Sequence, residues 1–452
     1  MKKWLCLLVL IATIINACTL TACVIPTAPS GGNSGGEGGE GSQNSGQGNT
    51  ENNGGTEENL GENLKNPGKY DDFILSEEKL REALDEAIIK VDMMTLTFLI
   101  DQFPAHNSTN NIYPSVKNTG GWNAGFWTGM LWHAYQLTGN KKYREYALEQ
   151  IPAYTKRIDE KLGTDTHDMG FVYSPSCVAA YKITGDEVAR ETALKAADQL
   201  LSRYHTNGSF IQAWGKMGAT NNYRLIVDCL MNIPLLYWAT EETGNPAYRN
   251  AAYNHFNTTI KNCYREDGST YHTYFFDPVT GSPLRGATHQ GVSDESTWAR
   301  GQAWAIYGPM LTFAYEHNSI ALTAFKEATE YFLDHLPSDY VPYWDFTYGD
   351  GAYQPKDSSA AAIAICGILE GLKYMDEDDP LYAKFSNAAK RMMNSLIDNY
   401  TTKDVESANG LLLHGTYNRN SNMGVDEMVI WGDYFYLEAL HRMLDSDWEL
   451  YW

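Results

Sequence analysis

The stretch LIVDCLMNIPLLYWATEETGNPAYRNAAYNHFNTTI, residues 225–260, indicates how the chain folds. Its first part, Leu225 to Trp238, is apolar at most positions, whereas Pro246 to Ile260 mixes apolar and polar residues at the spacing of an amphipathic helix. Thr243-Gly244-Asn245 separates the two parts. Glycine favours the left-handed end of one helix, and asparagine caps the start of the next. The stretch therefore predicts a hairpin of one buried and one half-exposed helix.

The same junction recurs along the chain, at Thr138-Gly139-Asn140 and at Thr184-Gly185-Asp186. Apolar residues at helical spacing predict twelve helices in total, which make six hairpins. The predicted helices span residues 76–102, 123–138, 141–158, 170–184, 186–204, 224–242, 245–264, 296–317, 320–336, 357–376, 380–399 and 426–444.

An inner ring of apolar helices surrounded by an outer ring of amphipathic helices satisfies this pattern. The predicted fold class is therefore all-α, an (α/α)6 toroid or six-hairpin barrel, with a superhelical solenoid of helix pairs as the alternative. In a toroid the segments before the inner helices converge on one mouth, and these segments carry the unusual residues. They are residues 118–122, 166–168, 215–222, 271–290 and 344–356.

The N-terminal part of the chain predicts export and a tether. Met1-Lys2-Lys3 and a short apolar run are typical of a secretory signal, and Leu20-Thr21-Ala22-Cys23 resembles a bacterial lipobox. We expect a signal peptide over 1–22 and lipidation of Cys23. The lipid would anchor the protein at the bacterial cell surface or in the periplasm and would be its sole contact with the membrane. An ordinary cleaved signal is the alternative. Residues 23–69, rich in Gly, Ser, Asn and Glu, predict a disordered flexible linker, which places the catalytic domain at 70–452.

Composition excludes several functions. The 452 residues carry 34 Lys plus Arg against 56 Asp plus Glu, and a net charge of −22 argues against nucleic acid or anionic lipid as a partner. The downstream cysteines are Cys177, Cys229, Cys263 and Cys366, and none forms a C-x-x-C pair. They are expected to be buried free thiols. We expect no metal and no organic cofactor.

Two aspartates are candidate catalytic groups. Asp168 precedes a predicted inner helix, and Asp228 interrupts an apolar run. A carboxyl group in apolar surroundings keeps its proton near neutral pH, which suits a general acid. The alternative is that both aspartates cap helices or pair with a nearby arginine such as Arg224.

A third group of residues indicates sugar binding. Arg300 and Trp304 are four residues apart, so on a helix they share a face that suits a sugar ring bearing a carboxylate. Trp122, Trp214 and Trp344 are candidate stacking platforms at the mouth. Core tryptophans with an outward arginine are the alternative, and His272 taken alone is more typical of a structural histidine.

Five motifs together resemble glycoside hydrolase family 88, the unsaturated glucuronyl hydrolases. They are His167-Asp168-Met169-Gly170-Phe171, Val227-Asp228-Cys229-Leu230-Met231-Asn232, the run from Asp294 to Trp304 (DESTWARGQAW), Lys356-Asp357-Ser358-Ser359-Ala360-Ala361 and Ile430-Trp431-Gly432-Asp433-Tyr434-Phe435. The resemblance extends from about Phe73 to the C-terminus and implies the (α/α)6 fold. It also implies release of 4,5-unsaturated uronic acid from the non-reducing end of lyase-generated oligosaccharides, by protonation at C4 and hydration of the C4=C5 bond.

The resemblance assigns roles residue by residue. It implies that Asp228 is the general acid and base and that Asp168 is a second essential carboxylate. The implied substrate-binding residues are His272, Gln290, Arg300, Trp304, Trp122 and Trp214. Members that prefer sulfated substrates carry Ser-x-x-Ser-x-Lys where this chain has Asn418, Ser421 and Met423, which argues against a strong sulfate preference there.

Two other functions compete with this prediction. Unsaturated rhamnogalacturonyl hydrolases share the toroid and act on pectin fragments, but the segment from Trp298 to Trp304 favours the glucuronyl side. A surface glycan-binding lipoprotein that has lost catalysis is the second alternative, and the presence of both Asp168 and Asp228 argues against it.

Overall fold

The computed structural model describes residues 68–452. The predicted signal peptide, the lipidated Cys23 and nearly all of the linker lie outside the described residues. Within 68–452 no helix combines the length and the apolar character that a membrane crossing requires. The four downstream cysteines are buried and free, as predicted.

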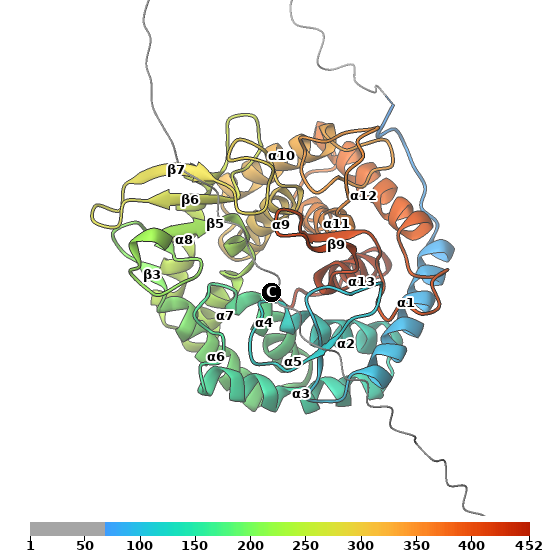
Figure 1. The fold of residues 1–452 in the computed structure, drawn as a ribbon, viewed down its shortest axis with the longest axis horizontal. Helices are drawn as coiled ribbons and strands as arrows, with labels where there is room; N and C mark the ends of the chain where they lie inside the picture. The colour runs from blue at the N-terminus through green and yellow to red at the C-terminus, as the bar shows by residue number, and fades with distance from the viewer. Residues whose placement is uncertain (1–67) are drawn as a thin grey trace, which may run out of the picture. The chain divides into compact units, whose positions relative to one another are not determined.

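The described residues form two concentric rings of helices, which confirms the predicted toroid (Figure 1). The inner ring consists of α2 (Ala124–Thr138), α4 (Met169–Tyr173) continued through the π-turn Ser174–Val178 into α5 (Ala179–Thr184), α7 (Pro234–Thr243), α9 (Ala299–Glu316), α11 (Ser358–Leu372) and α13 (Ile430–Leu444). The outer ring consists of α1 (Glu77–Thr97), α3 (Lys141–Asp159), α6 (Glu187–Leu201), α8 (Pro246–Cys263), α10 (Ser319–Asp334) and α12 (Pro380–Asn399).

The predicted junctions between paired helices are confirmed. Gly139, Gly185 and Gly244 have φ angles of 67°, 71° and 71°, in the left-handed region that a residue with a Cβ disfavours. The polar residue after each glycine caps the next helix; Asn245, for example, accepts a hydrogen bond from the backbone of Ala247 at 3.0 Å. These turns are local, so each hairpin forms from its own sequence.

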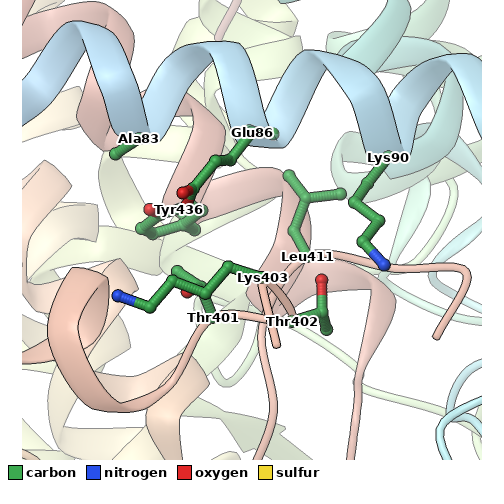
Figure 2. A pocket seen from close by; sticks show the side chains of 9 residues that line it. Ala83, Glu86, Lys90, Thr401, Thr402, Lys403, Leu411 and Tyr436 are labelled. Atoms are coloured by element: carbon green, nitrogen blue, oxygen red, sulfur yellow. The ribbon is translucent and has the colours of Figure 1, made fainter. Parts of the chain in front are cut away.

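The sixth hairpin joins the two ends of the described chain, because α13 packs against both α1 and α2. This closes the ring and excludes the solenoid. A small pocket marks the joint, where α1 faces the segment after α12 (Figure 2). In that pocket Lys90 points from α1 toward the segment and donates to the carbonyls of Val405 and Ala408 at 2.9 and 3.0 Å. Its ammonium group is thus used to hold α1 in place.

The predicted helix over 224–242 is wrong at its start. Arg224–Ile226 forms strand β5, Val227–Met231 a 3-10 turn, and α7 begins only at Pro234, whose missing N–H suits a first helical position. Strand β5 pairs with β6 (Thr273–Phe276), which pairs with β7 (Pro283–Ala287), all antiparallel. The other strands are β1 (Phe103–Pro104) with β2 (Ser115–Val116), β3 (Tyr204–His205) with β4 (Phe210–Ile211), and β8 (Gly415–Asn418) with β9 (Met423–Glu427).

Aromatic rings fill the axis of the toroid. Trp304 contacts Phe171 and Phe435, with ring centroids 5.1 and 5.4 Å apart, and Phe435 stacks on Trp452 at 6.0 Å. Trp452 accordingly lies near the centre of the ring, where Figure 1 marks the end of the chain. This aromatic layer closes the axis and forms the base on which the pocket described below is built.

Candidate active site

One pocket gathers all eight residues to which the family resemblance assigns a catalytic or substrate-binding role. Its volume is about 760 Å³, including solvent at the mouth, which is within the range of small-ligand sites. The side chains that line it are Trp122, His167, Asp168, Trp214, Asp228, His272, His289, Gln290, Trp298, Arg300, Trp304, Tyr417, Asn418 and Met423. They come from segments almost 300 residues apart in sequence, so the ring assembles the site.

Close backbone contact brings the two aspartates together. A Cβ on Gly170 would lie 2.4 Å from the Cα of Asn232, so only glycine permits this approach of α4 to the turn that carries Asp228. The Asn232 side chain accepts from the backbone of Phe171 at 2.8 Å and donates to the Asp228 carbonyl at 3.2 Å. Asn232 thereby ties the two motifs into one site.

Asp168 is held by two partners. Its Oδ1 lies 3.2 Å from Nε2 of the buried His167, and its Oδ2 accepts from the Thr166 hydroxyl at 2.5 Å. Burial raises the pKa of Asp168, but the contacts with His167 and Thr166 outweigh burial and hold it below its usual value. Burial likewise lowers the pKa of His167, but Asp168 raises it well above its ordinary value. The two groups therefore form a carboxylate–imidazolium pair.

Asp228 lacks such partners. Its Oδ1 is buried without a hydrogen-bond partner among the described residues, and desolvation raises the pKa of Asp228 from 3.8 to about 6, with His167 opposing and Asp168 adding to the shift. Neither aspartate makes a side-chain cap hydrogen bond, and no ion pair joins Asp228 to Arg224 within residues 68–452. The structure therefore removes the capping and arginine-pairing alternatives.

His167, Asp168 and Asp228 also form the kind of cluster that can hold a metal, since one ligand atom of each lies within 4.8 Å of the others. The raised pKa of His167 places a hydrogen on the Nε2 that faces Asp168, and this hydrogen would have to leave before the nitrogen could bind a metal. The residues present therefore fit an acid beside an ion pair.

His272 is neutral and oriented. Burial, followed by the charges of His289 and Arg300, lowers its pKa well below 6.5. Its Nδ1 accepts from the backbone amides of His289 and Gln290 at 3.0 and 3.3 Å, so the remaining hydrogen lies on Nε2. His272 therefore offers the pocket a hydrogen-bond donor without a positive charge.

Arg300 is a compensated cation. Its Nη1 donates to Asp357 at 2.7 Å and to the Thr416 carbonyl at 2.6 Å, while Nη2 donates to Gln290 at 2.9 Å and to the Tyr417 carbonyl at 2.7 Å. Its stacking partners are Trp298 and Trp431, at 4.4 and 4.9 Å, and both Arg300 and Trp304 line the pocket, as their shared helix face predicts. The Nη groups of Arg300 thus make four hydrogen bonds within the protein, and Asp357 balances its charge. That Arg300 contacts a substrate carboxylate stays a prediction.

The predicted tryptophan platforms divide into three kinds. Trp122 and Trp214 are half-buried pocket residues, and Trp122 donates to the Tyr417 hydroxyl at 3.2 Å. Trp304 lines the pocket from its floor and is only 1% exposed. Trp344 does not line the pocket, because its indole turns inward and donates to Gln354 at 3.2 Å. The platform predicted at Trp344 is therefore wrong.

Sequence reasoning missed four pocket residues: His167, His289, Trp298 and Tyr417. His167 had a signal, since it adjoins Asp168 in the motif. Trp298 had one too, because it lies in the DESTWARGQAW motif and is the N-cap residue of α9. His289 lies on the loop after β7 and Tyr417 on β8, and only the tertiary structure brings them to the pocket. Asn418 and Met423 line the pocket as well. These two uncharged residues stand where members that prefer sulfated substrates carry the first Ser and the Lys of Ser-x-x-Ser-x-Lys.

A closed α/α ring with a carboxylic acid, an ion-paired carboxylate and exposed tryptophan faces in one pocket defines a glycosidase of the six-hairpin class. Residues 99–443 match the model of Glycosyl Hydrolase Family 88, and the chain belongs to this family.

The chain is 46% identical to the unsaturated chondroitin disaccharide hydrolase of Streptococcus agalactiae, over 86% of this chain and 98% of that protein. It is 43% identical to the unsaturated glucuronyl hydrolase of Bacillus sp. GL1, over 76% of this chain and 91% of that protein. The crystal structure of unsaturated glucuronyl hydrolase from Streptococcus agalactiae superposes with a TM-score of 0.84 at 46% identity, covering 86% of this chain and 98% of that one.

Proposed function

We propose that this family member is an unsaturated glucuronyl hydrolase. It removes a 4,5-unsaturated uronic acid from the non-reducing end of glycosaminoglycan-type oligosaccharides left by polysaccharide lyases. The observation that carries the proposal is the unpartnered Asp228 carboxyl group, with its pKa raised to about 6, in a pocket with an adjacent ionised carboxylate. The names of the relatives above agree, and a mutant of the Streptococcus agalactiae enzyme has been crystallised with dGlcA-GalNAc6S.

The reaction follows from the enol ether of the substrate. Protonated Asp228 donates its hydrogen to C4, which moves positive charge to C5 and the ring oxygen. Water then adds to C5 and gives a proton to the Asp228 carboxylate, which restores the acid. The hemiketal opens to a ketone at C5 as the bond from C5 to the ring oxygen breaks and that oxygen takes the hydroxyl proton. C1 is then a hemiacetal, which collapses to an aldehyde as the bond to the aglycone oxygen breaks and that oxygen takes the hemiacetal proton.

Asp168 does not suit the role of a glycosidase nucleophile. Its two oxygens are engaged by His167 and Thr166, and the nearest approach of the two carboxyl groups, within 4.8 Å, leaves no space for the water of an inverting enzyme. The charge of Asp168 instead stabilises positive charge that develops at C5 and holds His167 in place. The spacing thus argues against an inverting pair, and the engagement of both Asp168 oxygens argues against nucleophilic displacement by Asp168.

The remaining pocket residues orient the sugar. The Nε2 hydrogen of His272 faces a hydrogen-bond acceptor of the uronate, and Gln290 is fixed by Arg300 at 2.9 Å. Trp122 and Trp214 offer ring faces on which sugars stack. These roles, like those of Arg300 and Trp304, are part of the proposal.

The direct test is the loss of the unsaturated-uronate absorbance when purified protein is mixed with chondroitin-, hyaluronan- and heparin-derived unsaturated disaccharides. We expect turnover of at least one of them and none of the matching disaccharides with a saturated uronate, because those lack the C4=C5 bond. An unsaturated rhamnogalacturonyl disaccharide is the competing substrate. Faster turnover of this pectin fragment would contradict the glucuronyl assignment, and binding without turnover would support the non-catalytic alternative.

We also propose that the enzyme is an exported lipoprotein anchored through Cys23. The apolar leader and the Leu20-Thr21-Ala22-Cys23 sequence support this. The full-length protein expressed in a bacterium should incorporate labelled palmitate and sediment with membranes, whereas Cys23→Ser should do neither. Equal sedimentation of both proteins would contradict the lipid anchor.

A further inference from the structure

A layer of cationic and aromatic side chains extends from the pocket along the three-stranded sheet. In the strand register Arg224 lies opposite Phe275, and Phe275 lies opposite Arg285. The Arg224 guanidinium lies 4.3 Å from the Trp214 ring and 5.0 Å from the Phe275 ring, and Arg285 lies 4.7 Å from Phe275. We name Arg224, Phe275 and Arg285 the arginine layer. It begins at Trp214, a residue of the pocket wall.

Arg224 has no counter-ion. Its Nε is buried without a hydrogen-bond partner, and no ion pair or side-chain hydrogen bond of Arg224 is formed within residues 68–452. Burial and the neighbouring Arg285 both lower the pKa of Arg224. Arg285 has a partner, Asp294 at 3.2 Å, but this pair is exposed and therefore weak. An unpaired, partly buried arginine carries a desolvation cost that no counter-ion offsets.

The charge of Arg224 reaches the pocket. Burial, together with Arg224, lowers the pKa of His289, whose ring is 5.6 Å from Trp214 and which lines the pocket. Arg300, the other arginine near the site, is already neutralised by Asp357 at 2.7 Å. Asn418 and Met423 carry no charge. Within the described part of the chain, Arg224 is therefore an uncompensated cation beside the pocket.

We propose that Arg224, supported by Arg285, is a binding subsite for an oxyanion on the sugars that follow the unsaturated uronate. The oxyanion is a sulfate ester on the adjacent sugar or the carboxylate of the next uronate. The Arg224 guanidinium packs on the rings of Trp214 and Phe275 and donates no side-chain hydrogen bond within residues 68–452, so its Nη groups are available to such an anion, and packing on the rings lowers the entropy lost on binding. The neighbouring sugar ring lies on Trp214. The inference rests on the proposed hydrolase function and adds a determinant of its substrate choice.

The experiment compares kcat and KM of the wild-type enzyme, Arg224→Gln and Arg224→Lys on three kinds of unsaturated substrate. These are an unsulfated disaccharide, disaccharides with a 4-O- or 6-O-sulfate on the second sugar, and an unsulfated tetrasaccharide whose third sugar is a uronate. Arg81→Gln on α1 is the matched control, because Arg81 is exposed, pairs with Glu77 and loses the same unit of charge. The unsulfated disaccharide tests whether each variant is folded and catalytically intact.

We expect Arg224→Gln to lower kcat/KM about tenfold, mainly through KM, for substrates with the recognised anion, and less than about twofold for the unsulfated disaccharide. Arg224→Lys should recover part of the loss and Arg81→Gln should cause none. Loss confined to the sulfated disaccharides identifies a sulfate subsite, and loss confined to the tetrasaccharide identifies a carboxylate subsite.

A loss of equal size on all substrates, or no loss on any, would overturn the subsite. The proposed function is tested separately by the wild-type enzyme. If it turns over none of these substrates, the hydrolase assignment is contradicted and the subsite with it. Turnover without a selective effect of Arg224→Gln contradicts only the subsite.

Discussion

Asp168 and Asp228 are both desolvated in the same pocket and differ in the partners that determine their charge. Asp168 contacts His167 and Thr166 through both oxygens, and its pKa is held below the usual value. Asp228 has an unpartnered buried oxygen, and its pKa is raised to about 6. Two carboxyl groups whose surroundings drive their pKa values apart mark the acid and the anion of a catalytic site. The division of labour therefore follows from neighbours, not from residue type.

Asp433 shows that a raised pKa alone does not make a catalytic acid. Burial raises the pKa of Asp433 to about 7, yet its oxygens accept from the Leu412 backbone at 2.8 Å and from the Tyr113 hydroxyl at 3.0 Å. Asp433 does not line the pocket. What distinguishes Asp228 is an oxygen without a protein partner on a side chain that lines the pocket.

The strongest test of the comparison is Asp228→Asn. Removing the proton donor should lower kcat by about 10²- to 10⁴-fold with little change in substrate affinity. Steady-state rates and equilibrium binding of an unsaturated disaccharide measure the two effects. Asp433→Asn is the matched control and should keep kcat within about threefold, since this carboxyl group contacts no substrate. An Asp228→Asn enzyme with near-normal kcat would assign the acid to another group.

The pH dependence tests which form of Asp228 is active. Because the protonated acid begins the reaction, kcat/KM should fall as pH rises through the pKa of about 6, by about tenfold for each further pH unit. Rates measured between pH 4.5 and 8.5 on one disaccharide would show this limb. A rate that rises through the same range would mean that the ionised carboxylate starts the reaction.

The same pKa shift predicts a stability effect. The pKa of Asp228 is higher in the folded protein than its value of 3.8 in the unfolded chain, so folding favours the protonated form. The resulting stability is present below pH 4 and is lost as pH rises through 6. Asp228→Asn, which cannot ionise, should therefore be more stable than wild type by about 1–3 kcal/mol at pH 8 and nearly equal at pH 4. Urea unfolding at both pH values measures the difference, and equal stability at pH 8 would contradict it.

A smaller effect tests the influence of His167. Its positive charge lowers the pKa of Asp228, so His167→Gln should move the alkaline limb of the pH profile upward by about one pH unit. His289→Gln is the matched control, because burial and Arg224 lower the pKa of His289 and leave it neutral. The limb should not move in this control. A downward shift in His167→Gln would mean that His167 does not act on Asp228 as a cation.

The helical architecture could be read from local patterns. The Thr-Gly-Asn and Thr-Gly-Asp junctions, and the contrast between apolar and amphipathic helices, act over one or two turns, so Gly139 and Gly244 have the predicted conformation. Asp168, Asp228 and six binding residues were also predicted, because the motifs that carry the family resemblance contain or flank most of them. Local pattern was less reliable at Arg224–Ile226. The sequence predicts the start of a helix there, whereas these residues form strand β5 and pair with β6.

The sequence by itself determined the helical hairpins, the candidate acid and the family, because these depend on residue type and short spacing. Only the tertiary structure decided which candidates meet and in what charge state. Ring closure joins α1 and α13, which are hundreds of residues apart, while the approach of Gly170 to Asn232 and the pairing of β5, β6 and β7 join segments separated by up to about sixty residues. Folding gave Arg300 its counter-ion, turned Trp344 away from the pocket and left Arg224 unpaired. It also gave the two aspartates different pKa values, because burial and neighbouring charge exist only in the folded chain.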